Sequence, residues 1–230
     1  MESPQVIYEN KDFLILNKPA GLLVHPAPGK EQENSLVDWL LKNYPEVWKV
    51  GDEPATRPGI VHRLDKDTSG IILIPRNQKT FEYFKDLFQS HKIKKTYLAL
   101  VVGNMKQESG IINQPIGIKD GTMKRSAYSS KMQKPAVTEY KVVKRVNIGK
   151  KEFTLLEVSP RTGRTHQIRV HLNFIGYPVV GDKLYGGSRT KLKGLSRQFL
   201  HAWTLEFTAP DGNRMKFEAD LPPELKSFLE

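Results

Sequence analysis

Residues 59–70, with the sequence GIVHRLDKDTSG, concentrate groups that could do acid–base or nucleophilic chemistry. A histidine, an arginine, a lysine, two aspartates and two hydroxyl side chains stand directly before the apolar run IILIP. Asp65 precedes that run by a few residues, so its carboxylate is expected at the edge of a buried strand. A carboxylate in such a partly dry position needs a cation nearby or takes up a proton. On these residues alone, a structural ion pair with Arg63 and a catalytic carboxylate both remain open.

A second stretch, RTGRTHQIRVHL at residues 161–172, combines a basic turn with an amphipathic helix. Gly163 can form the turn and Thr165 can cap the helix that follows. In that helix, apolar and polar side chains fall on different faces. The apolar face comprises Ile168, Leu172 and Ile175, and the polar face comprises His166, Arg169 and Asn173. Arg161 and Arg164 at the helix N-terminus suit a phosphate, with a solvated basic helix end as the alternative.

The histidines and aspartates of both stretches raise the question of a metal site, with His62, Asp65, Asp67, His166 and His171 as the candidates. His166 and His171 are five residues apart, which separates their side chains by about 140° around a helix, so they cannot chelate as an i, i+4 pair does. The sequence has no cysteine, no Walker-type loop, no GxGxxG after a strand and no GxSxG elbow. Metal, nucleotide-driven and serine-hydrolase chemistry are therefore disfavoured.

The charge balance favours a polyanionic partner. The 230 residues carry a formal net charge of +11, with a pI near 9.6. The basic residues gather at 91–95, 124–134, 141–151 and 189–197. Tyr97 and Tyr128 lie beside these stretches, an arrangement that suits phosphates together with stacked bases. Each stretch alone is typical of a solvated surface, but four on one chain favour RNA or DNA.

The N-terminal sequence lacks the basic and apolar regions of a signal peptide, and no stretch approaches the about 18 apolar residues of a membrane span. We therefore expect a soluble intracellular protein.

The first half of the chain must form the elements that position Asp65. A hairpin is expected from the apolar runs at residues 6–8 and 13–16. A helix should follow a capping residue at position 34 or 35 and stop at Pro45, before a surface loop over residues 45–59. Residues 71–74 are predicted to form a strand that is buried on both faces. Asn77 can cap a further helix, in which Phe81, Phe84 and Phe88 recur at helical spacing as core residues.

From Lys95 onward the sequence is mostly strand-like. Strands are predicted at TYLALVV, AVTEYKVV, EFTLLEV, LHAWTLEF and RMKFEA, and helices at RTHQIRVHLNF and after Pro222 and Pro223. The strands outnumber the helices and do not alternate regularly with them. The predicted fold class is therefore α+β, with a mixed, mainly antiparallel central sheet and flanking helices, in a single domain over residues 1–230.

Taken together, the motifs resemble the RluA-type pseudouridine synthases. GIVHRLDKDTSGIILIPRN resembles the catalytic motif of that family, and its other signatures occur in the family's order. They are NKPAGLLVHP, KKTYLALVVG, RTGRTHQIRVHL and GDKLYGG. The resemblance covers about residues 6–187. It implies a mixed central sheet crossed by an active-site cleft, and the isomerisation of selected RNA uridines to pseudouridine.

The resemblance also implies roles for individual residues. Asp65 would be the catalytic carboxylate, which either attacks the ribose or removes a ribose proton. Arg169 would pair with Asp65 and keep it ionised, and Tyr97 would stack on the target base. Because the target lies inside RNA structure, it must be flipped out, and Arg63 would contact the RNA backbone or fill the vacated space. The implied RNA-binding residues are His62, Arg63, Lys95, Arg161, Arg164 and His166.

The implied reaction is redox-neutral and requires neither a cofactor nor a metal. The sequence starts at the hairpin before NKPAG, so we expect no small N-terminal RNA-binding domain and recognition by the basic surface itself. Stem-loops of ribosomal or transfer RNA are the expected partners, with a cytoplasmic monomer and no membrane association. The alternatives are a non-catalytic RNA-binding or RNA-folding module and a metal-dependent phosphodiesterase.

Overall fold

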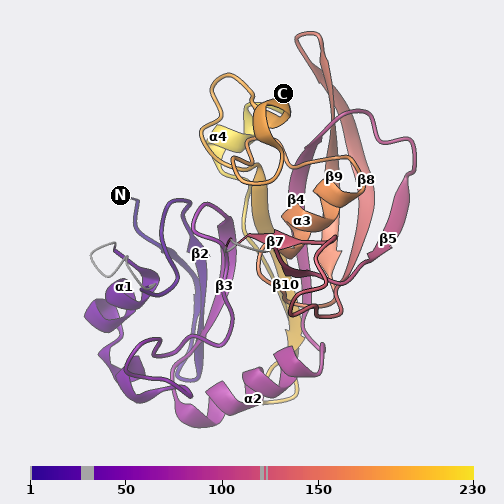
Figure 1. The fold of residues 1–230 in the computed structure, drawn as a ribbon. Coiled ribbons are helices and arrows are strands. Elements are labelled where there is room, and N and C mark those ends of the chain that lie inside the picture. The colour runs from indigo at the N-terminus through magenta and orange to yellow at the C-terminus, as the bar shows by residue number, and fades with distance from the viewer. Residues whose placement is uncertain (1, 27–33, 120–121, 123) are drawn as a thin grey trace. The chain divides into compact units, whose positions relative to one another are not determined.

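The computed structural model describes residues 2–26, 34–119, 122 and 124–230. The chain divides into two compact units, and Figure 1 labels the larger helices and most of the strands. The first unit consists of Met1–Lys94 and Ala202–Asp220, and the second of Lys95–His201 and Leu221–Glu230.

The sheet of the first unit has the strand order β1-β2-β3-β10, with β11 paired to β10. The predicted N-terminal hairpin is present, and its turn is closed by Asn10, whose Oδ1 accepts hydrogen bonds from the N–H groups of Asp12 and Phe13. The pairs β1–β2, β2–β3 and β10–β11 are antiparallel. The strand bounds are β1 Gln5–Glu9, β2 Phe13–Lys18, β3 Ser69–Pro75, β10 Leu200–Thr208 and β11 Arg214–Glu218.

Strand β3 is the buried strand that the run IILIP predicts, and all seven of its residues are buried. Gly70 in this strand has a φ of +113°, and a Cβ added there would lie 2.2 Å from the carbonyl oxygen of Ala202. The backbone at Ala202 therefore approaches β3 so closely that only glycine fits. This close approach fixes the strand that follows the Asp65 motif.

The helices of the first unit begin at the predicted caps. Ser35 forms a capping box with Asp38 at the start of α1 (Leu36–Asn43), and Asn77 caps α2 (Gln78–Gln89) by accepting from the N–H of Thr80. Residues 45–59, predicted as a surface loop, begin with a 3₁₀ helix, η1 (Pro45–Lys49). Val47 in this helix is fully buried in the core.

The three phenylalanines of α2 do not all behave as predicted. Phe81 and Phe84 are buried, as expected of core residues, whereas Phe88 is only partly buried.

The second unit has the strand order β4-β9-β8-β5 and a separate small sheet of β6 and β7. The pairs β4–β9, β8–β9, β5–β8 and β6–β7 are antiparallel. A buried cluster from β4, β9 and α3, which includes Ala99, Val158 and Ile168, forms its core. The strand bounds are β4 Lys94–Val102, β5 Ser109–Asn113, β6 Gly117–Ile118, β7 Arg125–Ser126, β8 Val137–Ile148 and β9 Lys151–Pro160.

The helix predicted within the stretch 161–172, α3 (Gln167–Phe174), packs on β8 and β9. The prediction that Thr165 caps it is wrong. The N-cap is His166, which lies in the left-handed region with a φ of 56° and makes no side-chain capping bond. The other helices of this unit are η2 (Gly187–Thr190) and α4 (Pro223–Lys226), the short helix expected after Pro222.

These elements confirm the α+β class with a mostly antiparallel sheet. No helix among the described residues is long and apolar enough to span a membrane. The organisation of residues 1–230 as a single domain stays a prediction.

Candidate active site

In the first unit, Asp65 lies on a short loop whose backbone is held at several points. Leu64 before it and Thr68 after it are buried, and the N–H of Thr68 donates to the carbonyl oxygen of Asp65 at 3.1 Å. Asp65 itself is partly exposed. The loop therefore keeps a carboxylate at the edge of the core and within reach of solvent, as the sequence predicts.

Lys18 anchors the same loop from the NKPAG motif. It is fully buried, and its ammonium donates to the carbonyl oxygens of Pro19 (2.8 Å), Leu22 (2.9 Å) and Lys66 (3.0 Å). The N–H of Gly21 donates to the Lys66 oxygen as well, at 3.0 Å. A buried ammonium needs such partners, so Lys18 ties the NKPAG loop to the peptide that follows Asp65.

His62 is packed and hydrogen-bonded within the first unit. Its ring stacks on Phe88 with centroids 4.5 Å apart, and its Nε2 accepts a hydrogen bond from the N–H of Leu73 at 2.9 Å. Since Nε2 is an acceptor in this bond, the ring is in the neutral form with its proton on Nδ1. Arg63, the next residue, is exposed. The RNA-binding roles expected for both residues stay predictions.

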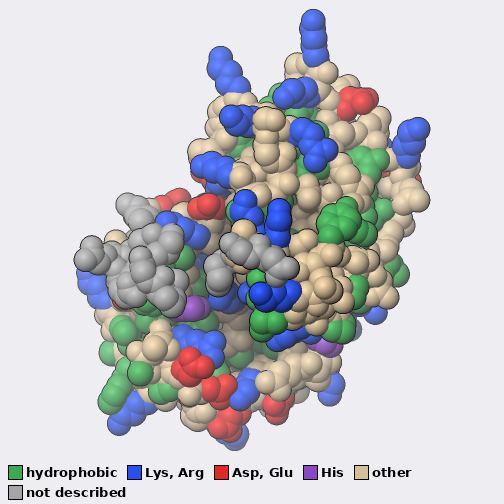
Figure 2. Space-filling view, in the orientation of Figure 1, with side chains coloured by type: hydrophobic (Ala, Val, Ile, Leu, Met, Phe, Trp, Pro, Cys, Tyr) green, Lys and Arg blue, Asp and Glu red, His purple; other side chains and the backbone are tan. Residues whose placement is uncertain are grey.

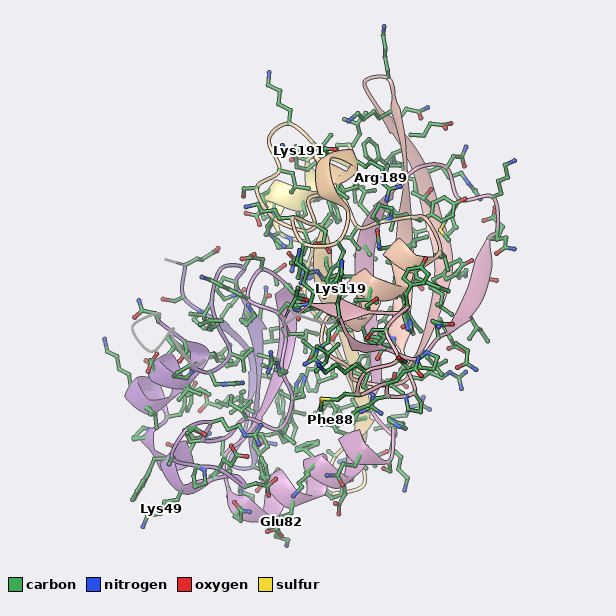
Figure 3. All side chains as sticks on the ribbon, viewed as in Figure 1. Lys49, Glu82, Phe88, Lys119, Arg189 and Lys191 are labelled. Atoms are coloured by element: carbon green, nitrogen blue, oxygen red, sulfur yellow. The ribbon has the colours of Figure 1, made fainter. Side chains whose placement is uncertain are left out.

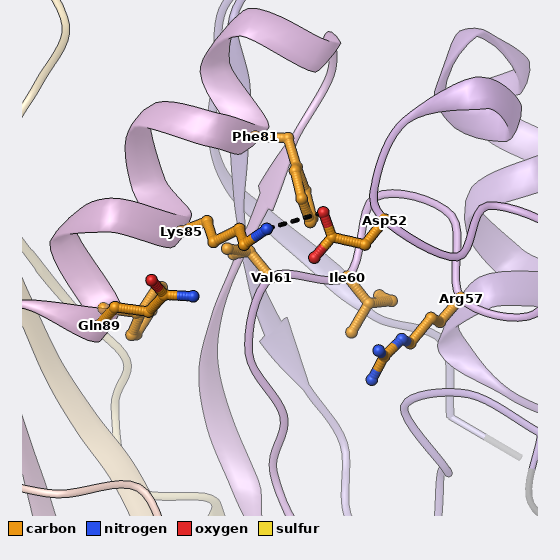
Figure 4. A pocket seen from close by; sticks show the side chains of 8 residues that line it. Asp52, Arg57, Ile60, Val61, Phe81, Lys85 and Gln89 are labelled. Atoms are coloured by element: carbon orange, nitrogen blue, oxygen red, sulfur yellow. Dashed lines mark hydrogen bonds and ion pairs between the residues drawn. The ribbon is translucent and has the colours of Figure 1, made fainter.

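The first unit also contains a pocket, which is shown in Figure 4. Phe88, whose ring stacks on His62, is one of its walls. Lys85 and Asp52 form an ion pair across it at 2.8 Å, drawn as a dashed line in Figure 4. Its lining residues are Asp52, Arg57, Ile60, Val61, Phe81, Lys85, Phe88 and Gln89.

In the second unit, Arg169 and Asp182 form a buried bidentate ion pair. Nε of Arg169 donates to Oδ2 at 2.7 Å and Nη2 donates to Oδ1 at 2.9 Å. Burial would raise the pKa of Asp182, but Arg169 and the N–H groups of Leu184 and Tyr185 outweigh it and hold that pKa below its usual value. Asp182 is therefore ionised and fixes the plane of the guanidinium. The pairing of Arg169 with Asp65 stays a prediction.

Tyr185 joins this ion pair to His166. The Cζ atom of Arg169 lies 5.1 Å from the centroid of the Tyr185 ring, and the Tyr185 hydroxyl lies 2.8 Å from Nδ1 of His166. The same hydroxyl accepts from the N–H of Arg125 at 3.1 Å. His166, Arg169, Asp182 and Tyr185 thus form one polar cluster at the N-terminus of α3.

Gln167 fixes the basic turn before α3. Its Oε1 accepts from the Thr162 hydroxyl (2.7 Å) and from the N–H of Arg164 (3.0 Å), while its Nε2 donates to the Thr138 hydroxyl (2.9 Å). Nδ1 of His171 lies 2.8 Å from the same Thr138 hydroxyl, and burial lowers the pKa of that imidazole. This network positions Arg164 from inside the core.

The two arginines of this turn have protein partners. Arg164 donates through Nε to the carbonyl oxygen of Pro135 at 3.0 Å, and Arg161 pairs with Glu139 at 2.6 Å. Arg161 is 65% exposed, so its guanidinium still faces solvent. Phosphate binding by either residue stays a prediction.

Tyr97 and Lys95 lie on β4 of the second unit. Tyr97 is opposite Val158 of β9 and packs against the core cluster that contains Ile168, so it shares a core with the helix that carries Arg169. Burial lowers the pKa of Lys95 to about 8. Lys95 is therefore a cation at neutral pH that loses its charge under mildly alkaline conditions.

The described ranges contain the His, Asp and Glu side chains that the sequence raised as metal-ligand candidates. No group of three or more His, Asp or Glu side chains there has the arrangement of a metal site.

The sequence reasoning missed three residues that shape the site, namely Lys18, Asp182 and Tyr185. All three lie inside motifs that were noted, NKPAG and GDKLYGG. The signal that could have identified them is a charged or phenolic residue next to glycines and prolines that form turns. Sequence alone did not say which cation the carboxylate of Asp182 would bind.

Comparison with known proteins identifies the family to which this fold belongs. Residues 12–174 match the family described as RNA pseudouridylate synthase. An RNA pseudouridine synthase of Chloroflexus aurantiacus, called uncharacterized, is 45% identical over 93% of this chain and 64% of its own length. The ribosomal large subunit pseudouridine synthase D of Borreliella burgdorferi is 35% identical over 97% of this chain and 67% of its own.

Solved structures agree with this match. The human RNA pseudouridylate synthase domain containing 1 superposes with a TM-score of 0.80 at 25% identity, covering 98% of this chain and 87% of the human one. The chain belongs to the RNA pseudouridine synthase family, which confirms the predicted family and the enzyme class, an RNA-modifying isomerase. It spans about two thirds of the length of the curated relatives it matches.

Proposed function

We propose that this chain isomerises selected uridines to pseudouridine in structured ribosomal or transfer RNA, with Asp65 as the catalytic carboxylate. The names of the ribosomal large subunit synthases favour ribosomal RNA. The observation that carries the proposal is the Asp65 loop, a partly exposed carboxylate on a backbone held by buried Lys18 and Gly21 through the carbonyl oxygen of Lys66. Such rigid positioning suits a group that must meet a reacting atom.

The proposed reaction conserves all atoms of the uridine except for one exchanged proton. The bond between ribose C1′ and uracil N1 breaks, the ring turns, and C5 joins C1′. C5 then loses its proton and N1 gains one. Asp65 would act either as a nucleophile on the ribose or as a base that removes a ribose proton. Tyr97 would stack on the base that is flipped out of the RNA.

Arg169 would hold the carboxylate of Asp65 as an ion while Asp182 fixes the guanidinium. Asp182 binds Nε and Nη2 of Arg169, and the proposal assigns the other edge of the planar group to Asp65. Residues 1–230 would then form a single catalytic domain. The polar cluster around Tyr185 would bind the RNA backbone through His166, with Arg63, Lys95, Arg161 and Arg164 as further phosphate contacts.

Tritium release from RNA labelled at uridine C5 tests this function. The RNA is isolated from a strain that lacks the gene, and no metal is added. Wild type and Asp67→Asn, the matched variant of a neighbouring carboxylate, should release tritium, whereas Asp65→Asn and Asp65→Ala should not, although they still bind the RNA. More than a few per cent of wild-type activity in either Asp65 variant would contradict the assignment.

The same assay distinguishes this function from the two alternative functions. A binding module would release no tritium from any variant while Asp65→Ala binds the RNA as well as wild type does. A metal-dependent phosphodiesterase would be stopped by excess EDTA and would shorten the RNA. We further propose a cytoplasmic monomer, which light scattering of the purified protein and fractionation of cells would check.

A further inference from the structure

The proposed function leaves three of the four basic stretches unused, and one of them, residues 124–134, is here called the basic segment. It carries two of the most exposed large hydrophobic side chains in the described part of the chain, Tyr128 at 78% and Met132 at 67%. A single exposed ring is common on protein surfaces and means little by itself. The surroundings of Tyr128 decide whether it has a role.

The backbone of the basic segment is held firmly. Gln114 donates through Nε2 to the carbonyl oxygen of Ala127 at 2.9 Å, and the N–H of Ile118 donates to that of Lys131 at 2.9 Å. The segment also lies directly on Gly117, where an added Cβ would be 2.5 Å from the carbonyl oxygen of Ser129. The position of Tyr128 is therefore fixed on both sides.

The ring of Tyr128 is supported from below. Ala127 is buried in a cluster with Val170 of α3, which turns the next side chain outward. The Tyr128 ring contacts Phe174, with centroids 5.2 Å apart and an interplanar angle of 54°. An aromatic ring backed by a second ring and otherwise open to solvent offers a flat surface to a base without losing much side-chain entropy on binding.

The charge of the basic segment is of one sign. It carries Lys124, Arg125, Lys131 and Lys134, and the sequence has no Asp or Glu between Asp120 and Glu139. The side chains of Lys124 and Lys134 form no ion pair with any residue that the structure describes. Nε of Arg125 is buried and has no hydrogen-bond partner among those residues, which leaves this donor available to a ligand.

The basic segment starts at the polar cluster of the proposed active site. The N–H of Arg125 donates to the hydroxyl of Tyr185, which also contacts His166 and lies under Arg169. Tyr128 is three residues further on, at most about 10 Å along the chain. A strand of RNA that leaves the cluster would therefore meet the Tyr128 ring within a few nucleotides of the target.

From this arrangement we propose that the basic segment binds the RNA strand beside the target uridine, and that Tyr128 stacks on one unpaired base of that strand. The inference rests on the proposed function and narrows its substrate. Stacking on an aromatic side chain needs a base that is out of its own helix. The substrate would be a loop, bulge or other unpaired region, and a fully paired duplex would bind only through its phosphates.

Fluorescence anisotropy with two labelled RNAs of equal composition tests the site. One is a hairpin with an unpaired uridine-containing loop and the other is a fully paired duplex. Tyr128→Ala should weaken hairpin binding about tenfold or more and leave duplex binding unchanged, whereas Tyr128→Phe should bind like wild type. Trp48→Ala, which removes another exposed aromatic ring, is the matched control and should have no effect.

The proposal predicts a separate effect on RNA binding for the lysines of the basic segment. Replacing Lys124 and Lys134 by Gln should weaken binding to both RNAs and lower the salt dependence of binding by about 0.7 per lost phosphate contact. If Tyr128→Ala binds the hairpin as wild type does, or if wild type binds both RNAs equally, the stacking site is wrong even when tritium release succeeds. Failure of tritium release in wild type would instead overturn the proposed function.

Discussion

The guanidinium of Arg169 and the carboxylate of Asp182 are joined by two parallel hydrogen bonds, of 2.7 and 2.9 Å, in the buried part of the second unit. Asp182 also accepts from the N–H groups of Leu184 and Tyr185, so all its main interactions are charge-assisted or backbone bonds. The pair fixes the orientation of the arginine that we propose as a partner of Asp65.

Asp182→Asn should therefore reduce both stability and activity. The substitution leaves a buried guanidinium without its counter-charge, which costs about 3 kcal/mol in the free energy of unfolding. Urea denaturation measures this cost, and tritium release at a temperature where the variant is folded measures activity. Asp211→Asn, which changes an exposed turn carboxylate, is the control. Full activity in a folded Asp182→Asn variant would remove Asp182 from the site.

Arg169→Lys should keep a small part of the activity and Arg169→Ala essentially none. Lysine restores the charge but not the planar fork that can bind two carboxylates at once. Arg197 offers a matched control, because it is an equally buried arginine of the second unit that pairs with Glu224. Arg197→Lys should lose stability and retain its activity per folded molecule. Similar losses of activity in both lysine variants would mean that Arg169 is only structural.

Lys18→Met should lower activity more than stability. The change removes the buried ammonium that donates to the carbonyl oxygens of Pro19, Leu22 and Lys66. Within the described part of the chain, only the Lys66 oxygen keeps a second bond, from Gly21. The loss costs at least about 1–3 kcal/mol in the free energy of unfolding. Because one of these oxygens belongs to Lys66, the loop that carries Asp65 should loosen. Single-turnover tritium release under folding conditions checks the rate, with the exposed Lys11→Met as the control. An unchanged rate would show that Lys18 does not position Asp65.

Gly70→Ala should prevent normal folding of the first unit. A Cβ at this position would lie within 2.7 Å of three backbone atoms of Ala202, and the φ of +113° is unsuited to alanine. The two effects together cost about 3 kcal/mol or more. Gly149→Ala shares only a positive φ, with nothing within 4 Å, and should cost about 1 kcal/mol. Thermal denaturation compares the two, and equal losses would contradict the close approach.

RNA binding should weaken between pH 7 and 9 because of Lys95. Burial lowers the pKa of this lysine to about 8, so its positive charge is present below that pH and is lost as the pH rises through it. Lys95→Arg keeps its charge throughout and should flatten the pH dependence of Kd, whereas Lys95→Gln should bind weakly at every pH. If Lys95→Arg follows the wild-type curve, the pH dependence has another origin.

Much of the fold could be read from the sequence because its signals are local. The caps at Ser35 and Asn77 bind N–H groups within three residues, and the uninterrupted run of apolar residues in β3 has no stable place except the core. The HRLD motif likewise identified Asp65 as the carboxylate at the edge of that strand. In these cases each residue and its partner are neighbours in the chain.

Only the tertiary structure decided the partners of the buried charges. Arg169 meets Asp182 and Lys18 meets Lys66 because the chain returns to the same place, 13 and 48 residues later. The left-handed conformation of His166, which displaces the predicted cap at Thr165, accompanies the contact of its ring with Tyr185. Long-range pairing is set by topology and packing. The sequence by itself therefore determined the family, strand β3 and the position of Asp65 at its edge, whereas the tertiary structure decided which residues hold them in place.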